Sequence, residues 1–291
     1  ETQSYGAGGK DVMVCMFTTG ETSSDGLVAR WPFDDSADPT PDDVAHGNNG
    51  TFVGGAGYQG GTNIAPVTGN VDALALDGLD DYMRAPYSLS SNTATTITAW
   101  INPSALISSP IVKVGDKRTL LWSADNVFFG GTTSSLAIAN QGVYAIAHGI
   151  PVDAWTHVVG TWDGTTARIY INGVLRNERS TGNGNEVNMF SDTSIGYGIV
   201  GYGYFPGLID EVRIYNRALS EREIRDLVNS APVASAGTDQ SVHVGNTVTL
   251  DGSGSTDIDG NLLTYGWAFT SKPSGSTATL VNPTSVNPTF M

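Results

Sequence analysis

Apolar and polar residues alternate at every second position over several short stretches of the chain. The alternation is clearest in residues 95–101 (TTITAWI), 155–162 (WTHVVGTW) and 166–171 (TARIYI). It places apolar side chains on one face of a β-strand and polar side chains on the other. The dipeptides Asp163–Gly164 and Asn172–Gly173 follow two of these stretches and are typical hairpin turns. The pattern predicts antiparallel strands joined by tight turns and arranged as a β-sandwich.

One segment, residues 220–228, has the pattern of a helix instead. Ser220 and Glu223 have the spacing of a capping box, in which each side chain binds a backbone N–H of the first turn. Ile224, Leu227 and Val228 then form an apolar stripe on one side. We expect a short helix that packs on a sheet.

Composition narrows the class of protein. The chain has 291 residues, of which 40% are hydrophobic and 36 are glycine, so it favours a folded, turn-rich β-protein over disorder. With 14 Lys plus Arg against 29 Asp plus Glu, the net charge is −15, which argues against nucleic acid or an anionic membrane as the main partner. The single cysteine, Cys15, excludes an intrachain disulfide framework and a cysteine-based zinc site. An acidic chain without disulfides fits an extracellular or cell-surface bacterial protein.

Residue composition and the pattern of apolar positions divide the sequence into three regions. Residues 1–25 form an N-terminal extension with one strand-like run, residues 26–229 form the main body, and residues 230–291 form a third region. The apolar run at residues 12–17 is shorter than a signal-peptide core or a membrane span. We expect two domains preceded by a short extension.

Residues 26–34 (GLVARWPFD), 46–51 (HGNNGT) and 76–82 (LDGLDDY) precede the alternating stretches, and residues 207–220 (GLIDEVRIYNRALS) follow them. Taken in this order, the main body resembles a laminin-G-like, concanavalin A-type jelly roll. The resemblance implies a sandwich of two antiparallel sheets. It leaves the function open, because this fold supports lectins, adhesion modules and glycosidases.

Residues 231–237 (APVASAG), 248–257 (VTLDGSGSTD) and 263–267 (LTYGW) are similar to a PKD-type immunoglobulin-like domain. A sandwich of that kind needs about 80 to 90 residues. Residues 232–291 provide only 60. We therefore expect an incomplete immunoglobulin-like β-sandwich that lacks its last strands.

The sequence does not favour catalysis. Glucanases of the same jelly-roll class carry Glu-x-Asp-x-x-Glu on one strand, where the carboxylates act as nucleophile and as acid/base. No glutamate in this chain has that spacing, and Glu211 has Asp210 beside it, which faces the opposite side of a strand. The glycine pattern of residues 196–201 precedes a strand and not the helix that a dinucleotide site requires. We interpret His157 as a packed framework residue and predict a protein that is not an enzyme.

A calcium site is the one cofactor that the jelly-roll resemblance implies, where the first strand and its following loop meet the last strand. Calcium binds about six to eight oxygens from carboxylates, carbonyls and water. By position, Asp34 and Asp210 would supply carboxylates, and Asn48 and Gly50 would supply loop oxygens. The alternative is that these aspartates only cap turns. A second run of oxygen-bearing residues, 257–261 (DIDGN), lacks the closing glutamate of an EF-hand and favours a plain turn.

Several aromatic residues lie in a glycine-rich segment near the end of the main body: Tyr197, Tyr202, Tyr204 and Phe205. They offer stacking faces to sugars, and they are equally compatible with a core or a protein contact. We expect a non-catalytic adhesion or structural module, with a carbohydrate-binding module of a secreted polysaccharide-processing protein as the alternative. Its partners would be other copies of itself or surface glycans, without nucleic acid or membrane insertion.

Residues 9–18 (GKDVMVCMFT) have the residue pattern expected of the missing last strand of the third region. An incomplete sheet exposes an unpaired edge and an open core, and a strand from another chain would cover both. We expect residues 10–18 of one copy to complete the 232–291 domain of the next, a contact that propagates as a filament unless it closes into a ring. Two alternatives remain: the chain is a piece of a longer repeat protein, or the strand folds back within its own copy.

Overall fold

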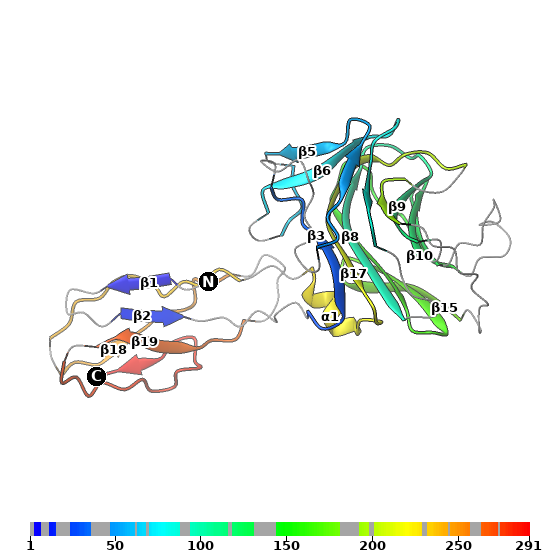
Figure 1. Cartoon of the computed structure of the whole chain (residues 1–291). Coiled ribbons are helices and arrows are strands. Elements are labelled where there is room, and N and C mark those ends of the chain that lie inside the picture. Colours follow the sequence, from blue (N-terminus) through cyan, green and yellow to red (C-terminus); the bar gives the residue numbers. More distant parts are fainter. Residues whose placement is uncertain are drawn as a thin grey trace. The chain divides into compact units, whose positions relative to one another are not determined.

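A computed structural model describes most of the chain: residues 3–6, 12–15, 24–35, 47–61, 63–67, 70–87, 94–115, 118–130, 144–180, 192–197, 201–228, 232–243, 245–256, 263–272 and 274–291. The chain forms two compact units, one of residues Thr22–Val228 and one that joins Glu1–Glu21 to Asn229–Met291. The regular secondary structure of both units is almost entirely β-strand (Figure 1), which confirms the all-β class predicted from the alternation.

The larger unit is a sandwich of two antiparallel sheets. In the first sheet the strand order is β15–β14–β13–β8–β17–β6–β5, and β3 pairs with β17 beside this path. Its strands are β3 (Leu27–Trp31), β5 (Gly57–Gly60), β6 (Asp72–Asp77), β8 (Thr95–Pro103), β13 (Thr156–Trp162), β14 (Thr166–Ile171), β15 (Val174–Ser180) and β17 (Pro206–Tyr215). The three alternating stretches of the sequence are β8, β13 and β14.

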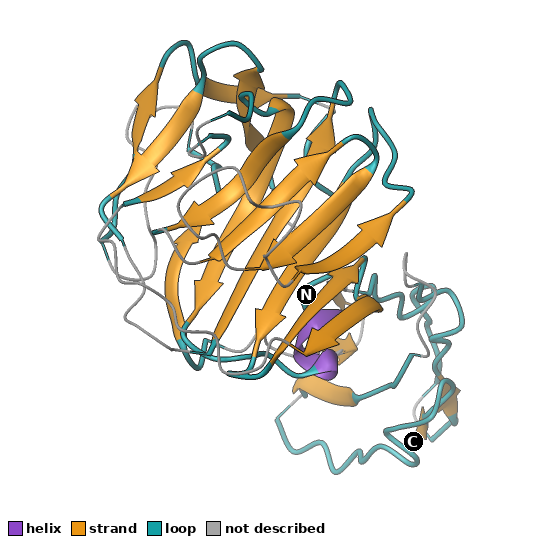
Figure 2. Ribbon diagram, turned by 90° about the vertical axis from the view of Figure 1, so that its right-hand side faces the viewer, coloured by secondary structure: helices purple, strands orange, loops and turns teal. Residues whose placement is uncertain are grey.

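The second sheet has the order β12–β11–β10–β9–β16–β7–β4. Its strands are β4 (Thr51–Val53), β7 (Tyr82–Ala85), β9 (Ser109–Val114), β10 (Arg118–Ser123), β11 (Asn126–Gly130), β12 (Tyr144–His148) and β16 (Thr193–Ile195). Figure 2 shows strands running side by side across the sheets. The jelly-roll sandwich expected for the main body is therefore present.

The core lies between the two sheets and is built from the apolar sides of the alternating strands. Its largest fully buried side chains include Trp31, Leu74, Met83, Ile97, Trp122, Phe129 and Phe205. At Gly160 of β13 the two sheets approach closely, because a Cβ atom at this position would lie 2.0 Å from the Phe129 ring. Glycine is needed here to let a ring of one sheet reach the backbone of the other.

The single helix of the described residues, α1 (Glu221–Asp226), has the predicted capping box between Ser220 and Glu223. Ile224 and Leu227 pack on an apolar patch of the larger sheet that includes Val159, Tyr170 and Tyr215. Six residues of helix have little stability alone, so this packing and the cap hold the helix in place. Among the described residues, no helix has the length and apolar character needed to cross a membrane.

The chain enters and leaves the larger unit at neighbouring points. Leu27, at the start of β3, packs on the same apolar patch as α1. Arg217 donates from Nε to the carbonyl oxygen of Asp25 at 2.8 Å, and the Asn216 N–H donates to the carbonyl of Gly26 at 2.8 Å. The segments that precede β3 and follow β17 therefore begin side by side.

The smaller unit contains a sheet of β1 (Gln3–Gly6), β2 (Val12–Cys15) and β19 (Trp267–Ser271), and a second pair of β18 (Val248–Thr249) with β20 (Thr289–Phe290). Trp267 and Ala234 are buried at its centre. Phe269 and Phe290 meet edge to face with ring centroids 5.2 Å apart, which joins the two strand groups.

The strand predicted as a donor pairs within its own chain. β2 runs antiparallel to β19, with Met13 opposite Phe269 and Val14 opposite Ala268. The N-terminal segment thus adds to the C-terminal sheet of its own chain, which is the fold-back alternative, and its donation to a second copy stays a prediction. Residues 1–21 form part of the smaller unit, where the sequence analysis had set residues 1–25 apart as an extension.

Candidate functional site

Strand β17 changes its hydrogen-bonding partner halfway along its length. Residues 206–209 pair with β6, and residues 212–215 pair with β3 on the same edge. On the opposite edge β17 pairs with β8, with a shift of register between Asp210 and Arg213. β6 and β3 therefore lie end to end along β17, and Asp210 and Glu211 occupy the gap between them.

A local distortion of β17 shapes this gap. Glu211 has a φ of 46°, in the left-handed region that is strained for a residue other than glycine. The Asp210 carboxylate accepts the Glu211 backbone N–H at 2.7 Å, which helps to hold this conformation. Both carboxylates are buried, with Asp210 0% exposed and Glu211 3% exposed. β-bulges commonly redirect side chains in this way.

Two arginines neutralise Glu211. Arg30 of β3 donates from Nε and Nη2 to its two carboxylate oxygens at 3.0 and 2.6 Å, and Arg213 donates from Nη2 at 2.9 Å. Burial opposes the ionisation of Glu211, but the hydrogen bonds and charges of the two arginines outweigh it and lower the pKa of Glu211. Glu211 is therefore an ionised structural group.

Asp210 and Asp34 have the opposite electrostatic environment. Burial, followed by the negative charges of Glu211 and Asp34, raises the pKa of Asp210 to about 8 in spite of a hydrogen bond from Asn70. Burial also raises the pKa of Asp34, which lies three residues after the end of β3, although the Val71 N–H donates to its carboxylate at 3.0 Å. Asp210 is fully buried and Asp34 is half-buried, and a cation between them would stabilise both charged carboxylates.

Asn70 completes the gap with an oxygen that lacks a partner. Its Nδ2 donates to Asp210 Oδ2 at 2.6 Å and to the Ala65 carbonyl at 3.1 Å, which fixes the amide. Its Oδ1 is buried and has no hydrogen-bond partner among the described residues. An unsatisfied buried acceptor costs about 1–3 kcal/mol, and a bound cation would remove that cost. Nothing in the sequence marked Asn70, since its contact with Asp210 joins positions 140 residues apart.

The four residues predicted as calcium ligands fall into two groups. Asp34 and Asp210 lie close enough for their charges to interact, at the junction of first and last strands where the resemblance placed them. Asn48 instead holds its loop to β3: its Nδ2 donates to the Val28 carbonyl at 3.2 Å, and its own carbonyl accepts from Trp31 Nε1 at 3.1 Å. Gly50 is buried immediately before β4. The hydrogen bonds of Asn48 therefore tie the loop before β4 to β3.

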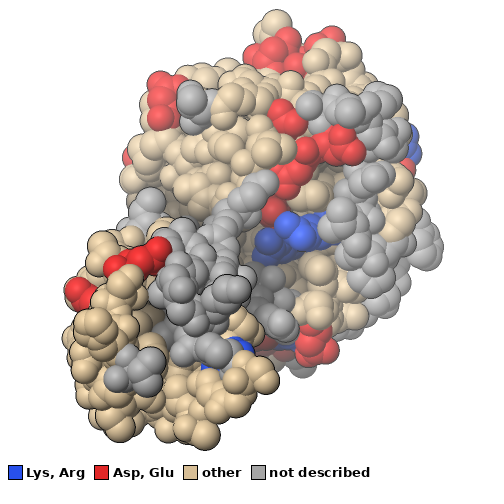
Figure 3. All heavy atoms as spheres, turned by 90° about the vertical axis from the view of Figure 1, so that its left-hand side faces the viewer, with Lys and Arg blue, Asp and Glu red and all other residues tan. Residues whose placement is uncertain are grey.

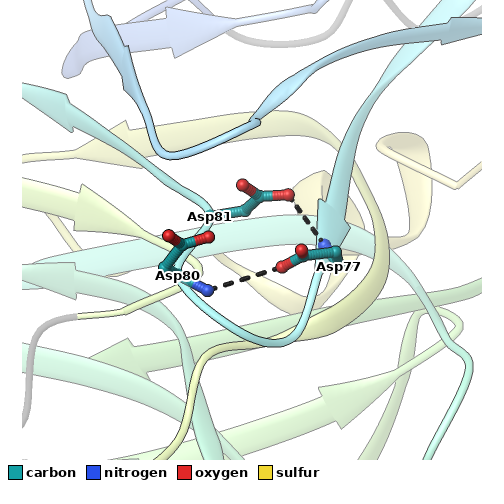
Figure 4. A group of neighbouring side chains, drawn as sticks. All are labelled: Asp77, Asp80 and Asp81. Atoms are coloured by element: carbon teal, nitrogen blue, oxygen red, sulfur yellow. Dashed lines mark hydrogen bonds between the residues drawn. The ribbon is translucent and has the colours of Figure 1, made fainter.

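A second group of carboxylates lies in the turn between β6 and β7 (Figure 4). Oxygens of Asp77, Asp80 and Asp81 lie within 4.8 Å of one another. Asp81 accepts the backbone N–H groups of Asp77, at 3.0 Å, and of Gly55, while Asp77 accepts the N–H of Leu79 at 2.7 Å. Asp77 and Asp81 therefore act as turn-capping groups, and Asp80 presents an exposed carboxylate.

The aromatic residues of the glycine-rich segment separate on folding. Phe205 is 0% exposed and belongs to the core. Tyr197 and Tyr204 are half-buried and stacked, with ring centroids 4.2 Å apart and planes 14° apart, and Tyr82 of β7 joins them at 5.5 and 6.2 Å. Residues 198–200 of the glycine pattern and the predicted turn at 257–261 lie outside the described residues.

Charge is unevenly distributed over the surface. On the face shown in Figure 3, acidic side chains gather in several groups, and basic side chains form a compact patch beside one of them. With a net charge of −15, such a surface attracts cations and repels polyanions.

Comparison with known families identifies both units. Residues 77–225 match the model of the concanavalin A-like lectin/glucanases superfamily, and residues 229–286 match that of the PKD domain. The first match covers half of the chain. The chain belongs to the concanavalin A-like lectin/glucanase superfamily. Both resemblances recognised in the sequence are confirmed. No curated protein matches the chain significantly.

Solved structures share the fold of this superfamily member at low sequence identity. The binding domain of Paraclostridial Mosquitocidal Protein 1 has a TM-score of 0.52 and 18% identity, over 70% of this chain and 52% of that one. The receptor binding domain of botulinum neurotoxin C/D mosaic serotype has a TM-score of 0.50 and 14% identity, over 70% and 51%. Domain 4 of AbnA, an extracellular GH43 arabinanase of Geobacillus stearothermophilus solved with arabinotriose, has a TM-score of 0.48 and 22% identity, over 71% and 100%. The chain spans about half of the length of the toxin domains.

Proposed function

We propose that the chain is a non-catalytic extracellular or cell-surface module for adhesion or structure, in a bacterial protein, and that one calcium ion stabilises its jelly roll. The proposal rests on the gap between β6 and β3, which pair one after the other with the same side of β17. The buried Asp210 carboxylate, the half-buried Asp34 carboxylate and the unpartnered amide oxygen of Asn70 meet there, between the ends of two strands. The superfamily membership and the adjoining PKD domain support a role in binding outside the cell.

The donor set of the gap fits calcium. Asp34 and Asp210 offer carboxylate oxygens and Asn70 offers the buried Oδ1, all of them hard oxygen ligands that calcium prefers. Backbone carbonyls and water would complete the coordination. Asn48, also predicted as a ligand, contributes in this proposal by fixing the loop before β4 against β3, and Gly50, the fourth predicted ligand, lies buried in the same loop. The bound ion would supply positive charge that offsets the repulsion between the two carboxylates.

The state of Glu211 supports a role without catalysis. It is the glutamate that stands on the last strand of the jelly roll, and its carboxylate is bound by both Arg30 and Arg213. A general acid needs a pKa raised towards neutrality, whereas these arginines lower it. A polysaccharide that releases reducing sugar in the presence of the chain would contradict this part of the proposal.

Chelation tests the calcium site. A ligand bound only by the folded state raises its stability by mass action, so EGTA should lower the thermal midpoint of the jelly roll at constant ionic strength. Asp210→Ala should remove the difference between calcium and EGTA. Asp239→Ala, at an exposed aspartate of the smaller unit, should retain it. An identical midpoint of the unaltered chain with and without EGTA would refute the calcium site.

We also propose that copies of the chain exchange strands. The proposal is favoured because the smaller unit is built from two segments that are far apart in the sequence, residues 1–21 and 229–291. The strand that completes its sheet comes from residues 1–21, with the whole larger unit between it and β19 in the sequence. The same β2–β19 pairing forms equally well between two copies, because every contact of the pair is retained. At high concentration, exchange would produce head-to-tail assemblies, since the contact is heterologous.

Disulfide trapping distinguishes exchange from fold-back. Val14 and Ala268 are directly opposite in antiparallel strands, at a separation that a disulfide can bridge. In a Cys15→Ser background, Val14→Cys chains and Ala268→Cys chains would be mixed at high concentration and oxidised. Exchange predicts covalent dimers of one chain of each kind. As the control, a single chain that carries both substitutions should form the disulfide internally. If it does and the mixed chains still form no covalent dimers, strand exchange is refuted.

A further inference from the structure

Three tyrosines form a cluster outside the core of the larger unit. Tyr197 and Tyr204 stack with planes 14° apart, and the Tyr82 ring lies at a tilt to both, 51° and 40°. All three are half-buried, and as far as the described residues go none is among the side chains that pack against the sandwich core. Large aromatic side chains that stack on one another without filling a core call for an explanation other than packing.

The backbone holds the rings in a fixed arrangement. Tyr197 follows β16, where Ser194 Oγ donates to its carbonyl at 2.5 Å. Tyr204 is anchored on both sides: the Gly203 N–H donates to the Ser108 carbonyl at 2.9 Å, and the Phe205 N–H donates to the Gly196 carbonyl at 2.8 Å. We call the three rings the tyrosine platform. Because their positions are fixed before a ligand arrives, the tyrosine platform loses little conformational entropy on binding.

An acidic turn adjoins the tyrosine platform. Tyr82 directly follows the acidic turn of Asp77, Asp80 and Asp81 shown in Figure 4. Desolvation, then the charge and hydrogen bond of the Tyr197 hydroxyl, and then the charges of Tyr82 and Asp80 raise the pKa of Tyr204, so Asp80 lies close enough to act on the Tyr204 hydroxyl. Asp80 is exposed, and its carboxylate can accept hydrogen bonds from a ligand.

We propose that Tyr82, Tyr197 and Tyr204, with Asp80 at their border, bind an uncharged polysaccharide. This inference rests on the proposed non-catalytic binding function and assigns its ligand. The C–H face of a sugar ring is apolar and carries partial positive charge, so it complements the negative face of an aromatic ring. The sugar hydroxyls are donors that match the Asp80 carboxylate and the tyrosine hydroxyls.

Charge selects the class of glycan. The exposed Asp80 carboxylate interacts with Tyr204 of the cluster, and the chain as a whole carries −15. Uronates, sulfated glycans and nucleic acids would be repelled at this position, because like charges brought together oppose association. Stacking on a neutral sugar carries no such cost.

Affinity electrophoresis tests the assignment with the full chain. The gels would contain one of four neutral polysaccharides, namely arabinan, xylan, mixed-linkage glucan or galactomannan, with polygalacturonate as the anionic comparison. We expect retardation by at least one neutral polymer and none by polygalacturonate. Tyr204→Ala should weaken the association about tenfold, because it removes half of the stacked pair. Tyr204→Phe, which keeps the ring, should retain most of the binding.

Tyr202→Ala is the matched control, since Tyr202 is a half-buried tyrosine of the same segment that lies outside the three-ring cluster. It should bind like the unaltered chain. The assignment is overturned if no neutral polymer retards the chain, or if Tyr204→Ala and Tyr202→Ala bind alike. The effect of EGTA on the thermal midpoint does not depend on glycan binding. Failure of the glycan site can therefore be distinguished from failure of the proposed function.

Discussion

Glu211 is the residue on which the geometry of the last strand depends most directly. It is nearly fully buried, adopts a left-handed backbone conformation, and receives hydrogen bonds from arginines of two strands. A buried charge is tolerated when it is paired and fully hydrogen-bonded. The ion pairs therefore hold β3 to β17 at the point where β17 changes partner.

Glu211→Gln should destabilise the larger unit by about 3 kcal/mol, because breaking a buried ion pair leaves uncompensated charge. Urea unfolding measures the change. Glu178→Gln is the matched control: Glu178 pairs with Arg168 at 3.0 Å but is largely exposed, so its loss should cost less than about 1 kcal/mol. Equal effects of the two substitutions would contradict the role given to Glu211.

His157 makes the fold sensitive to acid. Burial, and then the positive charge of Arg213, lower its pKa from 6.5 to about 3, although the charge of Glu211 acts in the opposite direction. The ring lies beside Trp100, with centroids 5.2 Å apart. In the folded state the imidazole is neutral at pH 5, whereas in the unfolded chain it binds a proton there.

Stability should therefore fall as the pH decreases from about 6.5 towards 3, because the unfolded state binds the extra proton. His157→Gln should reduce this slope relative to the unaltered chain, as measured by urea unfolding between pH 7 and pH 4.5. His243→Gln, at an exposed histidine of the smaller unit, should leave the slope unchanged. A slope for His157→Gln as steep as that of the unaltered chain would contradict the assignment.

At the scale of the elements, the strands and the helix follow from local patterns, whereas the candidate sites do not. The alternation in β8, β13 and β14 and the capping box of α1 are encoded by neighbouring residues, so they were predictable. Asp34 and Asp210 were placed by a resemblance in strand order. Asn70 and Tyr82 were missed because their partners lie far along the chain and meet them only when the sheets form.

The contact between Gly160 of one sheet and Phe129 of the other leaves no room for a side chain at position 160. Gly160→Ala would place a Cβ atom about 2 Å from ring atoms of Phe129, which is confined in the core. Overpacking at such a contact should cost about 3 kcal/mol or more. Gly57→Ala in β5, where the nearest atom to a new Cβ lies at 4.0 Å, is the matched control and should cost little. Thermal unfolding of the two variants checks the difference.

At the scale of the whole molecule, the order of the elements in the sequence differs from their grouping in space. The larger unit interrupts the smaller one, and its two ends lie side by side through Leu27 and α1. This proximity explains how residues 1–21 and 229–291 can form one unit without a long connection. Closing a loop is less costly when a rigid body already brings its ends together.

Removal of residues 1–20 tests that grouping. The truncated chain loses β1 and β2, so β19 becomes an unpaired edge and the smaller unit should unfold at a lower temperature. The larger unit keeps all its strands, and its transition, with its response to EGTA, should be unchanged. A synthetic peptide of residues 1–20 should restore the lost stability by strand addition, whereas the same peptide with Val14→Pro, which lacks a backbone donor in β2, should restore less. If truncation leaves the smaller unit as stable as before, residues 1–21 do not complete its sheet, and the strand-exchange proposal fails as well.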